Sequence, residues 1–205
     1  MRTAGQGPGG FEKRDGAMKP GQDLVLVGYA GLEGTRAAFR LKKEELKNRF
    51  PVSFLEELER EDSFSAETWL KEALLSKDNP ITAFEYAAEG GILAALWNIS
   101  GIFCAGIDVD LRAIPMRQVT VEVCEALELN PYRLQCGNCV ILAVDRGGQL
   151  VRQLRQEQIP AAVIGAVIPG DARRIRHEEE SAGYLERPQP DELEKLKQRL
   201  SDEPQ

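Results

Sequence analysis

Short apolar segments alternate with helix-like segments over the second half of the chain, and this alternation restricts the fold more than any other sequence feature. The apolar or alternating runs 81–84, 106–111, 139–144 and 162–168 are typical of β-strands, and residues between them carry apolar side chains at helical spacing. The links between these segments are short. We therefore predict one mixed layer of strands covered by helices.

The first half of the chain adds one strand and a helical region. Residues 24–27 form a short apolar run that ends at a glycine. Residues 35–77 are rich in helix-forming side chains and are interrupted at Pro51. We expect two or three helices here, with a capping box from Ser53 to Glu56 and an N-cap at Ser65.

Changes in composition along the sequence divide the chain into three parts. Residues 1–22 are rich in Gly and Pro and are predicted to be a flexible lead. Residues 23–187 are predicted to form one α+β domain, with a candidate edge strand at 182–185. Residues 188–205 are predicted to be a charged C-terminal helix and tail, with the surface helix at 191–200.

Composition excludes several classes of function. The 205 residues include 26 Lys and Arg against 33 Asp and Glu, and the net charge of -7 argues against binding nucleic acid or an anionic membrane. No apolar run approaches the roughly 20 residues of a membrane span, and the start lacks the apolar core of a secretory signal. The four cysteines are too few for a disulfide-stapled fold of this length, so we expect a soluble cytoplasmic protein.

Several short motifs follow one another in a fixed order. They are Lys19-Pro20-Gly21, the run from Val27 to Thr35, Gly90-Gly91-Ile92 with Leu96-Trp97, the run from Gly106 to Asp110 with Ile114-Pro115, Leu129-Asn130-Pro131, Cys136-Gly137, and the run from Ala162 to Gly165. This ordered set, over about residues 19–187, resembles the C-terminal domain of the AIR synthase-related (PurM C-terminal-like) superfamily. That superfamily includes aminoimidazole ribonucleotide synthetase, thiamine-phosphate kinase and the hydrogenase expression/formation protein HypE, whose branch is nearest. The resemblance implies an α+β fold with a mixed β-sheet covered by helices.

Three departures from the family pattern bear on function. The family's N-terminal domain supplies metal-binding acidic residues, most of the ATP pocket and a dimer interface, but only the glycine-rich lead precedes the match here. The family loop His-Asp-x-Thr-x-Gly-Gly is replaced by the run from Glu85 to Gly91, in which Glu85, Tyr86 and Ala88 stand at the three polar positions. HypE also ends in a cysteine that accepts a carbamoyl group, whereas this sequence ends in Gln205.

The glycine pair is the candidate ligand site. Gly90 and Gly91 open a helix, where free N–H groups and the helix dipole suit a phosphate, and the resemblance implies that this loop faces the active cleft. Glu85 and Glu89 lie close by in sequence and would repel an anion. We therefore predict a ligand- or phosphate-binding site at Gly90, Gly91, Glu85 and Glu89, and no catalytic or metal-binding residues. The alternative is that the glycines only allow the helix to pack tightly on a strand.

Two further motifs have a chemical and a structural interpretation. Gly28, Gly31 and Gly34 follow a strand and could cradle phosphate, but their spacing differs from the dinucleotide pattern and favours a structural turn. Cys136 and Cys139 form a CxxC motif that could be a redox pair or hold a metal. The simpler interpretation is two adjacent cysteines in the core, because Cys139 enters a strand rather than opening a helix.

The polar residues near the end of the domain favour structural interpretations. His177, the single histidine, lies in the charged stretch 173–180, which is typical of solvated surface. The arginines of this stretch could pair with a phosphate or an acidic partner, although its own glutamates are the simpler counter-charges. Asp108 and Asp110 share one strand face and could ligate magnesium, but such a pair is more often the wet side of an edge strand.

These observations leave two functional hypotheses. In the first, the chain is a non-catalytic binding or partner module. In the second, it is one half of an ATP-dependent enzyme of HypE type, and it uses ATP and magnesium only when a separately encoded N-terminal domain is supplied. The partner is then that protein, or a second copy in a homodimer that buries the face carrying Tyr29, Leu32, Tyr86 and Trp97.

Overall fold

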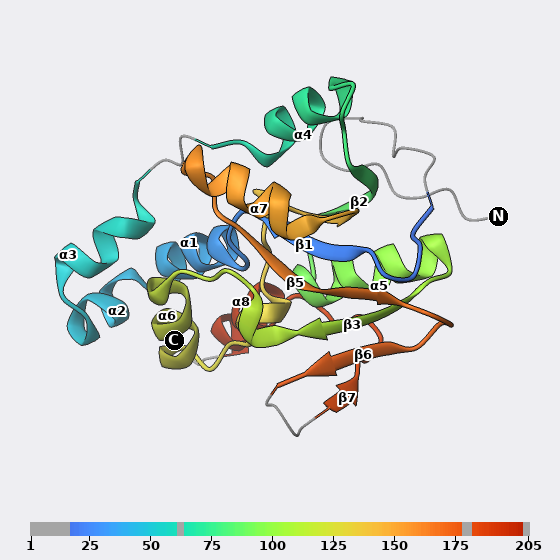
Figure 1. The fold of residues 1–205 in the computed structure, drawn as a ribbon. Helices are drawn as coiled ribbons and strands as arrows, with labels where there is room; N and C mark the ends of the chain where they lie inside the picture. The colour runs from blue at the N-terminus through green and yellow to red at the C-terminus, as the bar shows by residue number, and fades with distance from the viewer. Residues whose placement is uncertain (1–16, 61–63, 178–181, 203–205) are drawn as a thin grey trace.

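A seven-stranded sheet organises the chain in the computed structural model, which describes residues 17–60, 64–177 and 182–202 (Figure 1). The strands are β1 (Asp23–Val27), β2 (Ile81–Ala87), β3 (Gly106–Asp110), β4 (Cys139–Val144), β5 (Ala161–Ile168), β6 (Arg173–Arg176) and β7 (Ala182–Tyr184). Their order is β2-β4-β1-β5-β3-β6-β7, and every neighbouring pair is antiparallel except β3 and β6. The mixed sheet confirms the predicted α+β class.

Helices cover both faces of this sheet. They are α1 (Leu32–Leu41), α2 (Lys43–Arg49), α3 (Val52–Leu55), α4 (Ala66–Leu75), α5 (Gly91–Phe103), α6 (Gln118–Ala126), α7 (Gly147–Gln156) and α8 (Glu192–Asp202), with short 3-10 turns η1 (Glu56–Leu58), η2 (Leu111–Ala113) and η3 (Pro131–Arg133). Helix α5 packs on one face, and α4 and α7 pack on the other (Figure 1). Helices α1, α6 and α8 share a third apolar cluster beside the sheet.

The central strand β1 shows why the sheet needs helices on both sides. It lies between β4 and β5, and its apolar side chains alternate between the two faces. Leu24 and Leu26 belong to the cluster under α5, whereas Val25 and Val27 belong to the cluster under α4 and α7. Since all four are fully buried, β1 contributes to two cores at once.

The packed chain begins before the predicted start at Asp23. Met18 and Gln22 are buried, and the Gln22 carbonyl accepts the Val167 N–H at 2.8 Å. The Gln22 side-chain amide also donates to the Asp145 carboxylate at 3.1 Å. The end of the predicted lead is therefore fastened to β5 and to the loop after β4, while residues 1–16 lie outside the described residues.

The C-terminal helix is more than the predicted surface element. Leu193 and Leu196 of α8 are buried against the cluster that contains Phe39 of α1 and Val123 of α6. The Arg199 guanidinium reaches across and donates to the Leu127 carbonyl at 3.0 Å. Helix α8 is thus docked on the body, with its polar side toward solvent.

Two local predictions are corrected by the structure. Helix α3 begins with Pro51 at the N-cap position and has no side-chain cap, so the capping box at Ser53 does not form, whereas Ser65 does cap α4 by accepting the Thr68 N–H at 3.2 Å. The charged stretch at 173–176, predicted as solvated surface, is strand β6. The Ile175 side chain is buried, and parallel pairing with β3 gives the backbone of β6 its hydrogen-bond partners. These two contributions allow a strand to form in spite of the charged arginines on both sides of Ile175.

Candidate functional site

The glycine pair stands at the start of α5, as predicted. Gly90 and Gly91 both have left-handed backbone angles, with φ of 76° and 69°. A Cβ atom on Gly91 would lie 2.5 Å from the Tyr132 carbonyl oxygen and 2.8 Å from that of Leu134. Close backbone approach therefore demands glycine here, which supports the packing alternative for this residue.

A carboxylate of the chain itself lies where a bound anion would lie. The Gly90 N–H donates to Oδ2 of Asp191 at 2.8 Å, and the Leu193 N–H donates to Oδ1 at 2.9 Å. Asp191 is only 3% exposed and precedes α8, so its charge sits at the N-terminal ends of α5 and α8 together. Both helix dipoles and both charge-assisted hydrogen bonds stabilise that charge.

The four predicted site residues do not gather in one pocket. Glu85 is buried within β2, and Glu89 is exposed in the turn before α5. Gly90 lines a pocket of about 300 Å³, which Gly91 and the two glutamates do not line. These residues are close in sequence but point in different directions, because alternate side chains of β2 point to opposite faces of the sheet and the turn before α5 changes the direction of the chain.

Sequence reasoning missed the residues that share the Gly90 pocket. His177, Tyr132, Tyr184 and Arg187 line it with Gly90. His177 follows β6, so it could not be placed here without recognising that strand. The signal was the buried Ile175 between arginines, a short polar–apolar alternation.

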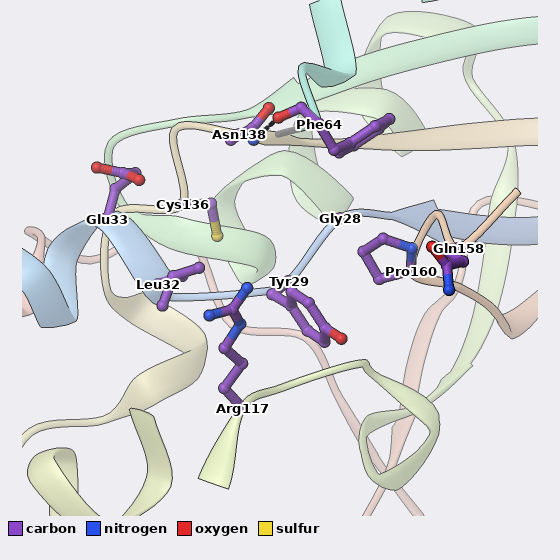
Figure 2. Close-up of a pocket in the computed structure, with 10 residues that line it drawn as sticks. All are labelled: Gly28, Tyr29, Leu32, Glu33, Phe64, Arg117, Cys136, Asn138, Gln158 and Pro160. Carbon is purple, nitrogen blue, oxygen red and sulfur yellow. Dashed lines mark hydrogen bonds between the residues drawn. The ribbon is translucent and has the colours of Figure 1, made fainter. Parts of the chain in front are cut away.

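A second pocket, of about 150 Å³, lies beside the start of α1 (Figure 2). It is lined by Gly28, Tyr29, Leu32, Glu33, Phe64, Arg117, Cys136, Asn138, Gln158 and Pro160. The Arg117 guanidinium carbon lies 4.9 Å from the centre of the Tyr29 ring and pairs with Glu57 at 3.3 Å. The pocket thus has an aromatic wall, a cation held over it and a thiol.

The glycine trio packs against the segment before β4. A Cβ atom on Gly28 would lie 2.4 Å from the Asn138 carbonyl oxygen. The Gly34 N–H donates to the Gln135 carbonyl at 2.8 Å, and the Gly31 N–H donates to the Cys136 sulfur at 3.3 Å. These contacts favour the structural turn over the phosphate cradle.

The cysteines occupy three environments. Cys136 and Cys139 are buried side by side, and a hydrogen bond to Cys136, together with burial, raises the pKa of Cys139 well above its ordinary value. Burial also raises the pKa of Cys124 to about 12. Cys104 is exposed at the C-cap of α5. Within the described ranges, no three His, Cys, Asp or Glu side chains form a metal-binding group.

The two strand carboxylates each have an arginine partner. Arg176 donates to Asp108 at 2.8 Å, and Arg112 pairs with Asp110 at 3.1 Å. The hydrogen bond from Arg112 lowers the pKa of Asp110 below its ordinary value. This pairing supports a polar strand face over a magnesium site, but the predicted edge position is wrong, because β3 lies between β5 and β6. The predicted counter-charges at 178–180 lie outside the described residues.

The residues predicted to form a dimer face, three aromatics and Leu32, do not share one exposed patch. Leu32 is buried, and Tyr29 borders the same cluster under Arg117. Tyr86 packs in the core on the α4 and α7 side. Trp97 packs on the α5 side, with the Arg173 guanidinium carbon 4.1 Å from its ring centre.

Comparisons with known proteins agree with the fold. A family model described as AIR synthase related protein, C-terminal domain, matches residues 19–178. Carbamoyl dehydratase HypE of Rhizobium leguminosarum bv. viciae is 27% identical over 177 residues, which are 83% of this chain and 48% of that protein.

Solved structures give the same result. The E. coli HypE structure, a hydrogenase maturation protein, has a TM-score of 0.66 at 21% identity and is matched over 86% of this chain and 52% of that one. Thiamine-monophosphate kinase from Stenotrophomonas maltophilia K279a has a TM-score of 0.54 at 16% identity, over 80% of this chain and 53% of that one. The chain therefore spans about half the length of these relatives. No helix in the described parts of the chain is long and apolar enough to cross a membrane.

Proposed function

Because the chain belongs to the AIR synthase-related C-terminal domain family, we propose that it is a partner-binding module of the HypE type in hydrogenase maturation, without catalytic activity of its own. The 27% identity to a HypE protein supports this choice within the family. The module acts in the cytoplasm, where structural disulfides are rare.

The contact between Gly90 and Asp191 carries the proposal. Phosphoryl chemistry requires a cradle of donors for the phosphates and a metal held by carboxylates. Here the Gly90 N–H already donates to an internal carboxylate at 2.8 Å, and Asp191 is almost fully buried. An incoming phosphate would have to displace this charge, and Glu85, Tyr86 and Ala88 replace the family's polar loop residues.

The proposed partner is a protein that carries a HypE-type ATP-binding half. One matched HypE structure was solved in a complex with HypF and another with ATP, so HypE proteins both assemble with partners and bind nucleotide. A homodimer is the other form of assembly, and light scattering of the purified chain distinguishes it from a 22.7 kDa monomer.

The test measures ATP hydrolysis and assembly together. The purified chain is expected to hydrolyse no ATP with magnesium, and isothermal calorimetry is expected to show that it binds the N-terminal half of a HypE protein. Magnesium-dependent turnover that follows the chain through purification would contradict the proposal. If the chain binds no HypE-type half, does not associate with itself and does not bind HypF, the proposal that it is a partner-binding module is wrong.

The alternative is one half of a split ATP-dependent enzyme. The observation that favours it is coverage, since the chain matches 52% of E. coli HypE and the ATP-bound HypE structure is matched over 53%. In that case the mixture of the two halves gains ATPase activity that neither half has alone. Binding without turnover in the mixture supports the module instead.

A further inference from the structure

Cys136 and Cys139 are held in a tight turn just before the central part of the sheet. The Asn138 N–H donates to the Cys136 carbonyl at 2.9 Å, and Gly137 adopts a left-handed φ of 75°. Cys139 is the first residue of β4, and both cysteines are buried in the same apolar cluster. The turn therefore brings two buried cysteines, separated by only two residues, into one place in the core, as a disulfide within the motif requires.

The Cys136 sulfur also borders open space. Although Cys136 is only 1% exposed, it lines the 150 Å³ pocket, and Figure 2 shows its sulfur directed toward Leu32 and Tyr29. A molecule the size of hydrogen peroxide fits in a cavity of this volume. Cys104 is exposed and Cys124 is buried, and neither lines this pocket.

The start of α1 polarises this sulfur. The Gly31 N–H donates to Sγ of Cys136 at 3.3 Å, and Gly31 is the N-cap of the ten-residue helix α1. An N–H donor and the positive end of a helix dipole both favour negative charge on the sulfur. The pKa of Cys139 is raised by its hydrogen bond to Cys136, so its thiol keeps its proton while Cys136 reacts.

We propose that Cys136 and Cys139 form a reversible disulfide when a hydroperoxide enters the pocket beside α1. The Cys136 thiol gives up its proton and its sulfur attacks one oxygen of hydrogen peroxide, so an S–O bond forms, the O–O bond breaks, and the departing hydroxide takes up that proton and leaves as the first water. The Cys139 sulfur then attacks the Cys136 sulfenic acid, the S–S bond forms, and its proton leaves with the hydroxide as the second water. Two electrons pass from two thiols to one peroxide.

This proposal is independent of the proposed function, because it uses neither the glycine pair nor a partner protein. Its structural consequence lies in the pocket. A bond to Cys139 replaces the Cys136 thiol with a disulfide sulfur, so oxidation alters the pocket wall at the atom that accepts the Gly31 N–H.

Mass spectrometry of the folded full-length chain tests the proposal directly. Trypsin cleaves after Arg133 and Arg146, so one peptide, 134–146, carries both cysteines, while Cys104 and Cys124 lie in separate peptides. After hydrogen peroxide and alkylation in denaturant, this peptide is expected to lose two hydrogen masses and take up no alkylating agent. Dithiothreitol is expected to restore double alkylation.

Variants assign the order of the steps. In Cys139→Ser, dimedone is expected to trap a sulfenic acid on Cys136, and in Cys136→Ser the peptide keeps one free thiol at Cys139. Near-ultraviolet circular dichroism checks that each variant folds, and the wild-type measurement needs no variant. A wild-type peptide that stays doubly alkylated at a peroxide dose that oxidises Cys104 would overturn the proposal, as would disulfides that join only Cys104 of two molecules.

Discussion

Helices α1 and α5 begin with the same backbone geometry, but the N–H groups of their N-cap glycines donate to different kinds of acceptor. Each follows a strand, and each has a left-handed glycine at its N-cap, Gly31 with φ of 69° and Gly90 with φ of 76°. Each glycine N–H donates to a side chain from a distant part of the chain. That acceptor is the Cys136 sulfur for α1 and the Asp191 carboxylate for α5.

The two acceptors differ in charge and in what lies beside them. The carboxylate is charged, nearly fully buried and shared with the start of α8, so it fills the anion position of α5 in the folded state. The thiol is a weak acceptor that borders a cavity and has a second thiol beside it. Two similar helix starts can therefore carry a structural charge and an oxidisable group.

The largest expected effect on stability comes from the glycines, whose backbones are constrained differently at the start of α5 and at the start of α1. Gly91→Ala is expected to lower the free energy of unfolding by about 3 kcal/mol or more, because it strains a left-handed residue and pushes Cβ into two carbonyl oxygens. Gly34→Ala in α1 is expected to cost about 1–2 kcal/mol, since its φ is not left-handed and its Cβ meets mainly the Leu134 side chain. Urea unfolding measures both.

Gly148→Ala is the matched control for these two variants. Gly148 lies in α7, and nothing lies within 4 Å of the position of its Cβ. We expect no loss of stability and a gain of at most about 1 kcal/mol. Equal losses for Gly91→Ala and Gly34→Ala would mean that backbone crowding does not distinguish the two starts.

The next effect distinguishes the two acceptors. Asp191→Ala is expected to cost about 2–3 kcal/mol, because it leaves the Gly90 and Leu193 N–H groups without their charged acceptor. Cys136→Ala is expected to cost about 1 kcal/mol, since it removes a weaker acceptor and one buried sulfur. Denaturant titration of both variants, with Asp202→Ala at the exposed end of α8 as the near-neutral control, measures the ranking. A larger loss for Cys136→Ala would reverse the comparison.

Sequence reasoning located most elements because their patterns are local. The apolar run of β4, the helical stripe of α5 and the alternation of β3 each appear within a few residues, and all three elements form at their predicted places. Strand β6 was missed because arginines conceal its single buried residue, Ile175. Its pairing with β3 is a property of the sheet and not of the segment.

The candidate site was only partly predictable for the same reason. The sequence identifies Gly90 and Gly91 as a helix start, but the residue that fills the anion position, Asp191, is 101 positions away from Gly90. The CxxC motif was visible, but the pocket beside Cys136 depends on segments at 28–33, 117 and 158–160 that only the fold brings together. Local spacing indicates which groups can react, and long-range packing determines what they face.

The smallest expected effect concerns two tyrosines near the start of α5, and alkaline pH reveals it. Burial, followed by the charge of Glu67, raises the pKa of Tyr86 to about 12, and burial also raises that of Tyr132. In the unfolded chain these tyrosines ionise near pH 10, whereas in the folded state they keep their protons to a higher pH. Their contribution to the free energy of unfolding is therefore complete below pH 10 and is lost as the pH rises to about 12.

Tyr86→Phe is expected to be neutral or slightly stabilising at pH 7, because the Tyr86 hydroxyl is buried without a partner, and to lose less stability between pH 10 and 12 than the wild type. Tyr132→Phe is the contrasting variant, since its hydroxyl donates to the Leu111 carbonyl at 3.3 Å and its removal is expected to cost about 1 kcal/mol at pH 7. Urea unfolding at pH 7 and across the alkaline range measures both, and a Tyr86→Phe variant whose alkaline loss equals that of the wild type would show that this hydroxyl is not the titrating group.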